Sequence, residues 1–142
     1  MTIPPLLGTL ETALYADDLD AARMFWTDIM GLEEIVSVPG RHVFFRTADQ
    51  PRPQVLLVFN PEATEVPPKP GADQPVPPHG ARGPGHACLA VAPEALDRWR
   101  AHLENHGIGI EADFLWPNGR RSVYFRDPAG NSIELADPAI WG

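Results

Sequence analysis

The sequence predicts an α+β fold of two tandem βαβββ modules that form a curved mixed sheet around a cavity. Three observations support this prediction: the same order of one strand, one helix and three strands occurs twice, residues 41–46 (RHVFFR) are repeated as residues 121–126 (RSVYFR), and a proline-rich segment separates the two copies. Because the elements recur in the same order, an internal duplication is indicated. We therefore expect one domain with a first module at 1–60, a linker at 61–84 and a second module at 85–142.

The first module opens with an apolar strand at residues 10–16. Apolar side chains recur at helical spacing through residues 17–30, with aspartates at the start to cap the helix and Gly31 to end it. Three short strands are expected at 32–38, 41–47 and 54–59, because turn-forming residues separate them. The predicted order is βαβββ.

The second module repeats this order. A strand at 86–91 precedes a helix at 93–106, which has a proline in its first turn and Gly107 behind it. Strands at 108–115, 121–126 and 132–136 follow, separated by turns at 117–119 and 127–130. The segment 61–84 holds eight prolines and is predicted to be either a lid over a pocket or a simple connector.

Composition and charge exclude several function classes. The chain has 142 residues, 44% of them hydrophobic, which is enough to bury a core. Its formal net charge of -8 disfavours binding to nucleic acid or to anionic membranes. Since no apolar run has transmembrane length and residues 1–8 contain no Lys or Arg, we expect a cytoplasmic protein without a signal peptide. The single cysteine, Cys88, excludes an intrachain disulfide and a thiolate zinc cluster.

Aligning the two modules singles out four equivalent positions. Glu11 is matched with His86, and Leu57 with Glu134, so three of the four positions hold residues that bind divalent metals. Glu134 also interrupts an apolar strand, where a carboxylate is costly unless it meets a cation or a donor. We therefore predict a metal site made of Glu11, His86 and Glu134. Two carboxylates and one imidazole leave Mn, Fe, Ni, Co, Zn and Mg open.

Each of these residues also has a simpler interpretation. Glu11 alone could be an exposed strand-end carboxylate or an ion-pair partner of Arg121. His86 alone could be a turn residue. Tyr15 shares the strand face of Glu11 and is predicted to pack in the core rather than to line a pocket. The remaining histidines other than His42 are interpreted as surface residues: His79, His102 and His106.

Two segments carry a resemblance to a known family. The first, residues 11–19, leads into a helix that ends in Met-Gly-Leu at 30–32, and the second contains Asp-Pro-x-Gly-x-x-Ile-Glu-Leu at 127–135. Together with the repeated modules, they resemble the vicinal oxygen chelate superfamily, which includes glyoxalase I, fosfomycin- and bleomycin-resistance proteins, methylmalonyl-CoA epimerase and extradiol dioxygenases. The resemblance covers almost the whole chain outside the proline-rich linker. It implies metal ligands at Glu11, His86 and Glu134.

The chain departs from the family pattern at two of these positions. Leu57 stands where glyoxalase I-like members usually have a fourth ligand that also moves a proton, and Glu11 stands where fosfomycin-resistance enzymes and extradiol dioxygenases usually have histidine. Tyr124 matches a tyrosine that contacts catechol in extradiol dioxygenases, which implies a hydrogen-bond donor either to the substrate or to a metal ligand. However, residues 113–120 lack the histidine base of those enzymes.

We therefore expect a divalent-metal-dependent, glyoxalase-like enzyme that acts on a small molecule with two neighbouring oxygens, with Glu134 and Tyr124 as catalytic residues. A lyase or isomerase reaction is expected before a dioxygenase or thiol transferase reaction. The alternative is a bleomycin-resistance-type protein that sequesters a ligand without catalysis, which the acidic charge also suits. We expect a homodimer, and the modules could pair within one chain or across two chains.

Overall fold

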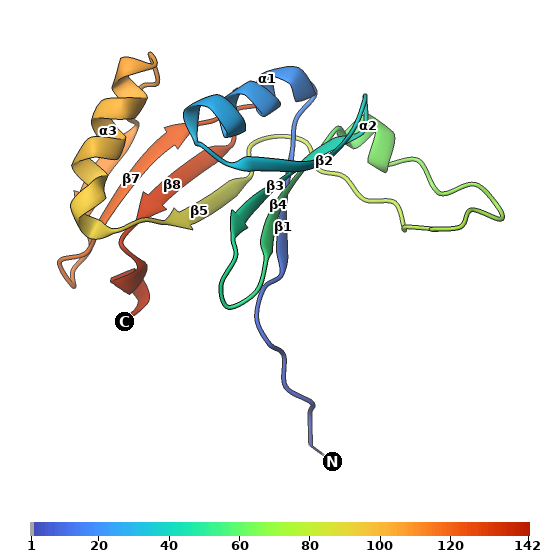
Figure 1. The fold of residues 1–142 in the computed structure, drawn as a ribbon, viewed down its shortest axis with the longest axis horizontal. Coiled ribbons are helices and arrows are strands. Elements are labelled where there is room, and N and C mark those ends of the chain that lie inside the picture. Colours follow the sequence, from blue (N-terminus) through green and yellow to red (C-terminus); the bar gives the residue numbers. More distant parts are fainter. Residues whose placement is uncertain (1) are drawn as a thin grey trace.

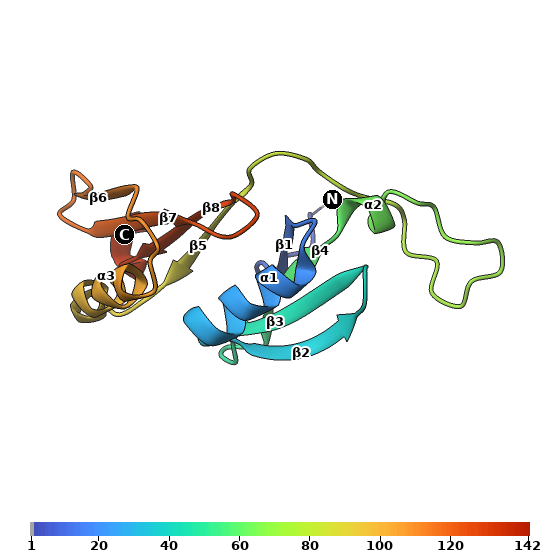
Figure 2. The ribbon, with the colours of Figure 1, turned by 90° about the horizontal axis from the view of Figure 1, so that it is seen from above.

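The computed structural model describes residues 2–142 and contains two four-stranded mixed sheets, with strand orders β1-β4-β3-β2 and β5-β8-β7-β6. The two sheets lie side by side, with helix α1 packed against the first and helix α3 packed against the second (Figures 1 and 2). This arrangement confirms the predicted α+β fold of two βαβββ modules. No helix within residues 2–142 is long and apolar enough to cross a membrane.

The secondary structure follows the predicted order. The first sheet contains β1 (Glu11–Tyr15), β2 (Glu33–Val38), β3 (His42–Ala48) and β4 (Gln54–Phe59), with α1 (Leu19–Met24) continuing as a π-helical turn at Phe25–Ile29. The second sheet contains β5 (His86–Ala90), β6 (Ala112–Leu115), β7 (Arg121–Arg126) and β8 (Ser132–Ala136). Its helix α3 (Leu96–Asn105) follows a 3-10 turn at Pro93–Ala95, and a second 3-10 turn, Pro138–Trp141, ends the chain.

Strand register places the matched positions at equivalent points of the two sheets. Leu57 of β4 pairs with Phe44 of β3, and Glu134 of β8 pairs with Tyr124 of β7. In both sheets the first and last strands of the module are parallel neighbours, β1 with β4 and β5 with β8. Leu57 therefore occupies in the first sheet the position that Glu134 occupies in the second.

Several element boundaries differ from the predictions, and at two of them a local cap overrides the apolar pattern. Helix α1 begins at residue 19 because the Asp18 carboxylate accepts a hydrogen bond from the Ala21 amide at 3.0 Å. Strand β6 begins at residue 112, since the Ile108 amide donates to the Leu103 carbonyl at 3.0 Å and so belongs to the helix end. Ile108 and Ile110 then pack against the core instead of pairing in the sheet.

One apolar core extends through both modules. Its largest buried side chains include Trp26 and Phe45 from the first module and Phe125 and Leu103 from the second. The ring centroids of Phe25 and Phe125 lie 6.3 Å apart, so the first helical segment also contacts the second module. The modules therefore fold against one another rather than independently.

Polar contacts join the modules as well. The buried Asn131 amide group accepts from the Gly85 amide at 2.8 Å and donates to the Tyr15 carbonyl at 3.2 Å. His102 of α3 donates from Nε2 to the Ile29 carbonyl at 2.7 Å. The prediction that His102 is a surface residue is therefore wrong, because its ring bridges the two modules, and this contact depends on packing that no local pattern shows.

A charge network fixes α3 to the second sheet. Asp113 on β6 accepts hydrogen bonds from Arg121 at 2.8 Å and from Arg100 at 2.7 Å. The bonds from Arg121 are the main reason that the pKa of Asp113 is lowered to about 2. Arg121 also binds Asp97 at 2.6 Å. The guanidinium is thus occupied by two aspartates, and the alternative pairing of Arg121 with Glu11 is wrong.

The proline-rich segment is folded against the first sheet at both ends. It begins as a short helix, α2 (Pro61–Thr64), and the His79 amide returns to the Thr64 carbonyl at 2.9 Å. The Tyr15 hydroxyl forms a 2.7 Å hydrogen bond with His79 Nδ1. Tyr15 and His79 are both half-buried, so the predictions of a core tyrosine and a surface histidine are wrong. Between these contacts the segment forms the long loop to the right of α2 in Figure 1.

Candidate metal and substrate site

The open face of the second sheet carries the polar side chains that the sequence singles out. Successive strand residues point to opposite faces, and the core takes Val123, Phe125, Ile133 and Leu135. The intervening residues of β5, β7 and β8 therefore face away from the core. They contribute to a cavity of about 540 Å³ that is lined by His86, Cys88, Trp116, Pro117, Asn118, Tyr124, Glu134, Ile140 and Trp141.

His86 and Glu134 face each other in this cavity. His86 Nδ1 lies 2.9 Å from the Ser132 carbonyl oxygen and donates to it, which leaves Nε2 as the ring nitrogen that faces Glu134. That Nε2 lies 3.3 Å from Glu134 Oε1. Two acceptor atoms at this distance repel each other unless a proton or a cation lies between them. Ligand atoms that are each about 2.1 Å from one ion lie about 3 to 3.4 Å apart at ordinary coordination angles, so the pair fits a divalent metal.

Glu134 is held tightly although it is a buried carboxylate. It is 5% exposed, and its Oε2 accepts a hydrogen bond from Ser122 Oγ at 2.5 Å. Ser122 Oγ in turn accepts from Trp116 Nε1 at 2.8 Å. These contacts occupy one carboxylate oxygen and leave Oε1 directed at His86. Strand alternation places Ser122 on the face of Tyr124 and predicts it as a pocket-wall residue without an assigned role, whereas Trp116 was not predicted from the sequence.

Tyr124 and Cys88 complete the polar surroundings of Glu134. Burial is the main reason that the pKa of each is raised to about 12, and the adjacent Glu134 carboxylate raises both further. The phenol and the thiol are therefore neutral near pH 7 and act as hydrogen-bond donors, although a cation bound by Glu134 would lower both pKa values. Tyr124 is thus suited to the predicted role of donor. Cys88 was not predicted as a site residue, and its signal is its position two residues after His86 on the same strand.

Glu11 lies in a different cavity of the same chain. It is exposed at the start of β1 and lines a space of about 830 Å³ on the first sheet, with the aromatic side chains of His42, Phe44 and Phe59. Residues of the proline-rich segment between Val66 and His79 also line this cavity. Within residues 2–142 of one chain, no group of three or more His, Cys, Asp or Glu side chains is placed to hold a metal. The structure therefore brings His86 and Glu134 together but not Glu11.

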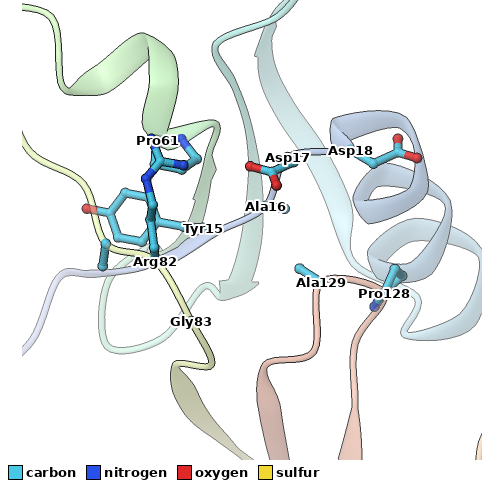
Figure 3. Close-up of a pocket in the computed structure, with 10 residues that line it drawn as sticks. Tyr15, Ala16, Asp17, Asp18, Pro61, Arg82, Gly83, Pro128 and Ala129 are labelled. Carbon is cyan, nitrogen blue, oxygen red and sulfur yellow. The ribbon is translucent and has the colours of Figure 1, made fainter.

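A third cavity lies at the junction of the modules and contains none of the predicted site residues. It measures about 360 Å³ and is lined by Tyr15, Asp17, Arg82 and Pro128 among others, as Figure 3 shows. Asp18, which also borders it, already caps α1. We assign it no part in the chemistry of the second sheet.

Comparison with known proteins identifies the family of the fold. A model of the Glyoxalase/Bleomycin resistance protein/Dioxygenase superfamily matches residues 8–135. A solved structure of lactoylglutathione lyase from Agrobacterium tumefaciens is 44% identical, covers 98% of this chain and 99% of its own, and superposes with a TM-score of 0.87. A glyoxalase/dioxygenase from Nostoc punctiforme is 27% identical, with 97% of each chain covered and a TM-score of 0.67. A fosfomycin resistance protein from Listeria monocytogenes, 18% identical with 98% of each chain covered and a TM-score of 0.66, shares the fold.

Proposed function

Because this chain belongs to the Glyoxalase/Bleomycin resistance protein/Dioxygenase superfamily, we propose that it is a divalent-metal-dependent, glyoxalase-like lyase or isomerase acting on a small molecule with two neighbouring oxygens. The observation that carries this proposal is the 3.3 Å approach of His86 Nε2 to Glu134 Oε1 in a cavity large enough for a small substrate. A histidine or a glutamate alone on a strand would not indicate a metal site. Facing each other, they would supply two ligands to one divalent ion.

The remaining residues have roles that follow from their positions. A divalent ion at His86 and Glu134 supplies Lewis acidity, which stabilises negative charge that develops on a substrate oxygen. The neutral Tyr124 phenol donates a hydrogen bond to that substrate, since its ring stacks 6.1 Å from His86 at the same cavity wall. Trp116 lines the same cavity and reaches the site through its hydrogen bond to Ser122.

A homodimer explains the separate location of Glu11. In the proposed dimer, the first sheet of one chain faces the second sheet of the other, so that Glu11 of the partner subunit completes the ligand set of His86 and Glu134. Two facts support this arrangement: Glu11 is exposed on an open cavity of the first sheet, and the cavity of the second sheet contains two of the three predicted ligands. The symmetry of the dimer would generate two such sites.

The reaction is tested first with lactoylglutathione, which the Agrobacterium relative is named for. Because Leu57 cannot move a proton, a panel of other small substrates with neighbouring oxygens is assayed in parallel. We expect the metal-loaded protein to convert at least one of these compounds, a chelator to stop the conversion, and added metal to restore it. Turnover that resists chelation would contradict the proposal. Binding of a ligand without turnover, unaffected by chelator, would instead support the sequestering alternative.

A further inference from the structure

We propose that Trp116 and Ser122 are positioning residues that hold the Glu134 carboxylate in the orientation in which it would bind a metal ion. This inference rests on the proposed metal site and adds two residues to it. Its basis is the hydrogen-bond chain in which Trp116 Nε1 donates to Ser122 Oγ at 2.8 Å and Ser122 Oγ donates to Glu134 Oε2 at 2.5 Å.

The direction of this chain is fixed by the chemistry of its members. An indole nitrogen can donate but not accept, and an ionised carboxylate can accept but not donate. The Ser122 hydroxyl between them therefore accepts from Trp116 and directs its single proton at Glu134. Because Ser122 is 0% exposed, water does not compete for either bond. Glu134 Oε2 is thus anchored by this bond, and Oε1 faces His86 Nε2.

The indole itself is held in place by its surroundings. The Trp116 carbonyl accepts from the Gly119 amide at 2.8 Å, and its amide donates to the Arg120 carbonyl at 2.7 Å, which closes the turn between β6 and β7. The ring packs on Phe114, with centroids 4.8 Å apart. The turn is tied to the chain end, because the Asn118 side chain donates to the Ile140 carbonyl at 3.1 Å. Fixing the indole in this way fixes the serine hydroxyl and hence the carboxylate.

A thermodynamic cycle on metal affinity tests this inference. The dissociation constant for Mn²⁺ is measured by calorimetric titration of the wild-type protein, of Trp116→Phe, of Ser122→Ala and of the double variant. Trp116→Phe keeps the aromatic packing and removes the N–H. We expect each single variant to bind Mn²⁺ about 10-fold more weakly or worse, as is typical when a residue that orients a metal ligand is lost. The double variant is expected to bind no more weakly than Ser122→Ala, since Trp116 acts only through the serine.

Controls separate positioning from general damage. Trp99→Phe, on α3 and remote from the cavity, removes another indole N–H and is expected to leave Mn²⁺ affinity unchanged. Ser122→Thr retains the hydroxyl and is expected to restore most of the affinity lost in Ser122→Ala. If both single variants bind Mn²⁺ with the affinity of the wild type, or if the two losses add fully in the double variant, Trp116 and Ser122 do not position Glu134. These outcomes leave the proposed metal site intact. A wild-type protein that binds no metal would overturn the proposed function as well.

Discussion

Heterodimers that combine a Glu11→Ala chain with a His86→Ala chain are expected to bind about one metal ion per dimer, although each variant homodimer binds none. In a shared site, Glu11 of one subunit acts with His86 and Glu134 of the other. One of the two sites in the mixed dimer then retains every ligand, and the other loses two. The chains are co-expressed with different affinity tags, purified through both tags, and analysed for bound metal.

A second mixed dimer provides the matched control. Chains carrying His86→Ala and Glu134→Gln each lose a ligand from the same sheet, so a heterodimer of these two has no intact site under the shared arrangement. We expect it to bind no metal. If both heterodimers lack metal, the shared site is wrong. If the Glu11→Ala homodimer itself binds metal as well as the wild type does, Glu11 is not a ligand.

Replacing Asn131 by leucine is expected to lower the free energy of unfolding by about 3 kcal/mol or more. Asn131 is 2% exposed and its amide group connects the Gly85 amide, the Tyr15 carbonyl and the Asp127 carboxylate. Leucine has a similar volume but satisfies none of these groups, so each is left buried with fewer partners. Urea unfolding at one fixed protein concentration measures the change.

Asn105→Leu serves as the comparison for this variant. Asn105 is exposed at the end of α3, and replacing it is expected to change the unfolding free energy by less than about 0.5 kcal/mol. If the free energy of unfolding of Asn131→Leu is within about 1 kcal/mol of the wild-type value, the amide contacts between the modules contribute little to stability. The result also bears on the family motif, since Asn131 lies within the Asp-Pro-x-Gly-x-x-Ile-Glu-Leu segment.

Several strands were predictable because their residues either alternate between apolar and polar or form a short apolar run bounded by turn residues. Strands at 54–59, 121–126 and 132–136 have the predicted bounds, since apolar and polar residues alternate there or run continuously into the core. The start of β6 was not predictable. Ile108 and Ile110 are as apolar as strand residues, but they pack against the core beside the end of the helix. Hydrophobic spacing alone does not distinguish these two uses.

The site was predictable in part for the same reason. The internal repeat matched Leu57 with Glu134, and the strand register agrees with that match. The separation of Glu11 from His86 was left open, because it depends on how the modules pack and not on the sequence within either one. Trp116 was missed because it lies in a turn, where side-chain direction has no periodic signal. Its contact with Ser122 appears only in three dimensions.

Elemental analysis of the purified protein is the most direct test of the central claim, which is that His86 and Glu134 bind a divalent ion. The protein is analysed after reconstitution with Mn, Fe, Ni or Zn and removal of free metal, beside a Glu134→Gln variant of nearly equal volume. We expect about one ion per wild-type chain and almost none in the variant, because the amide replaces the anionic ligand. Absence of metal from the wild type with every ion, or equal metal in Glu134→Gln, would contradict the account.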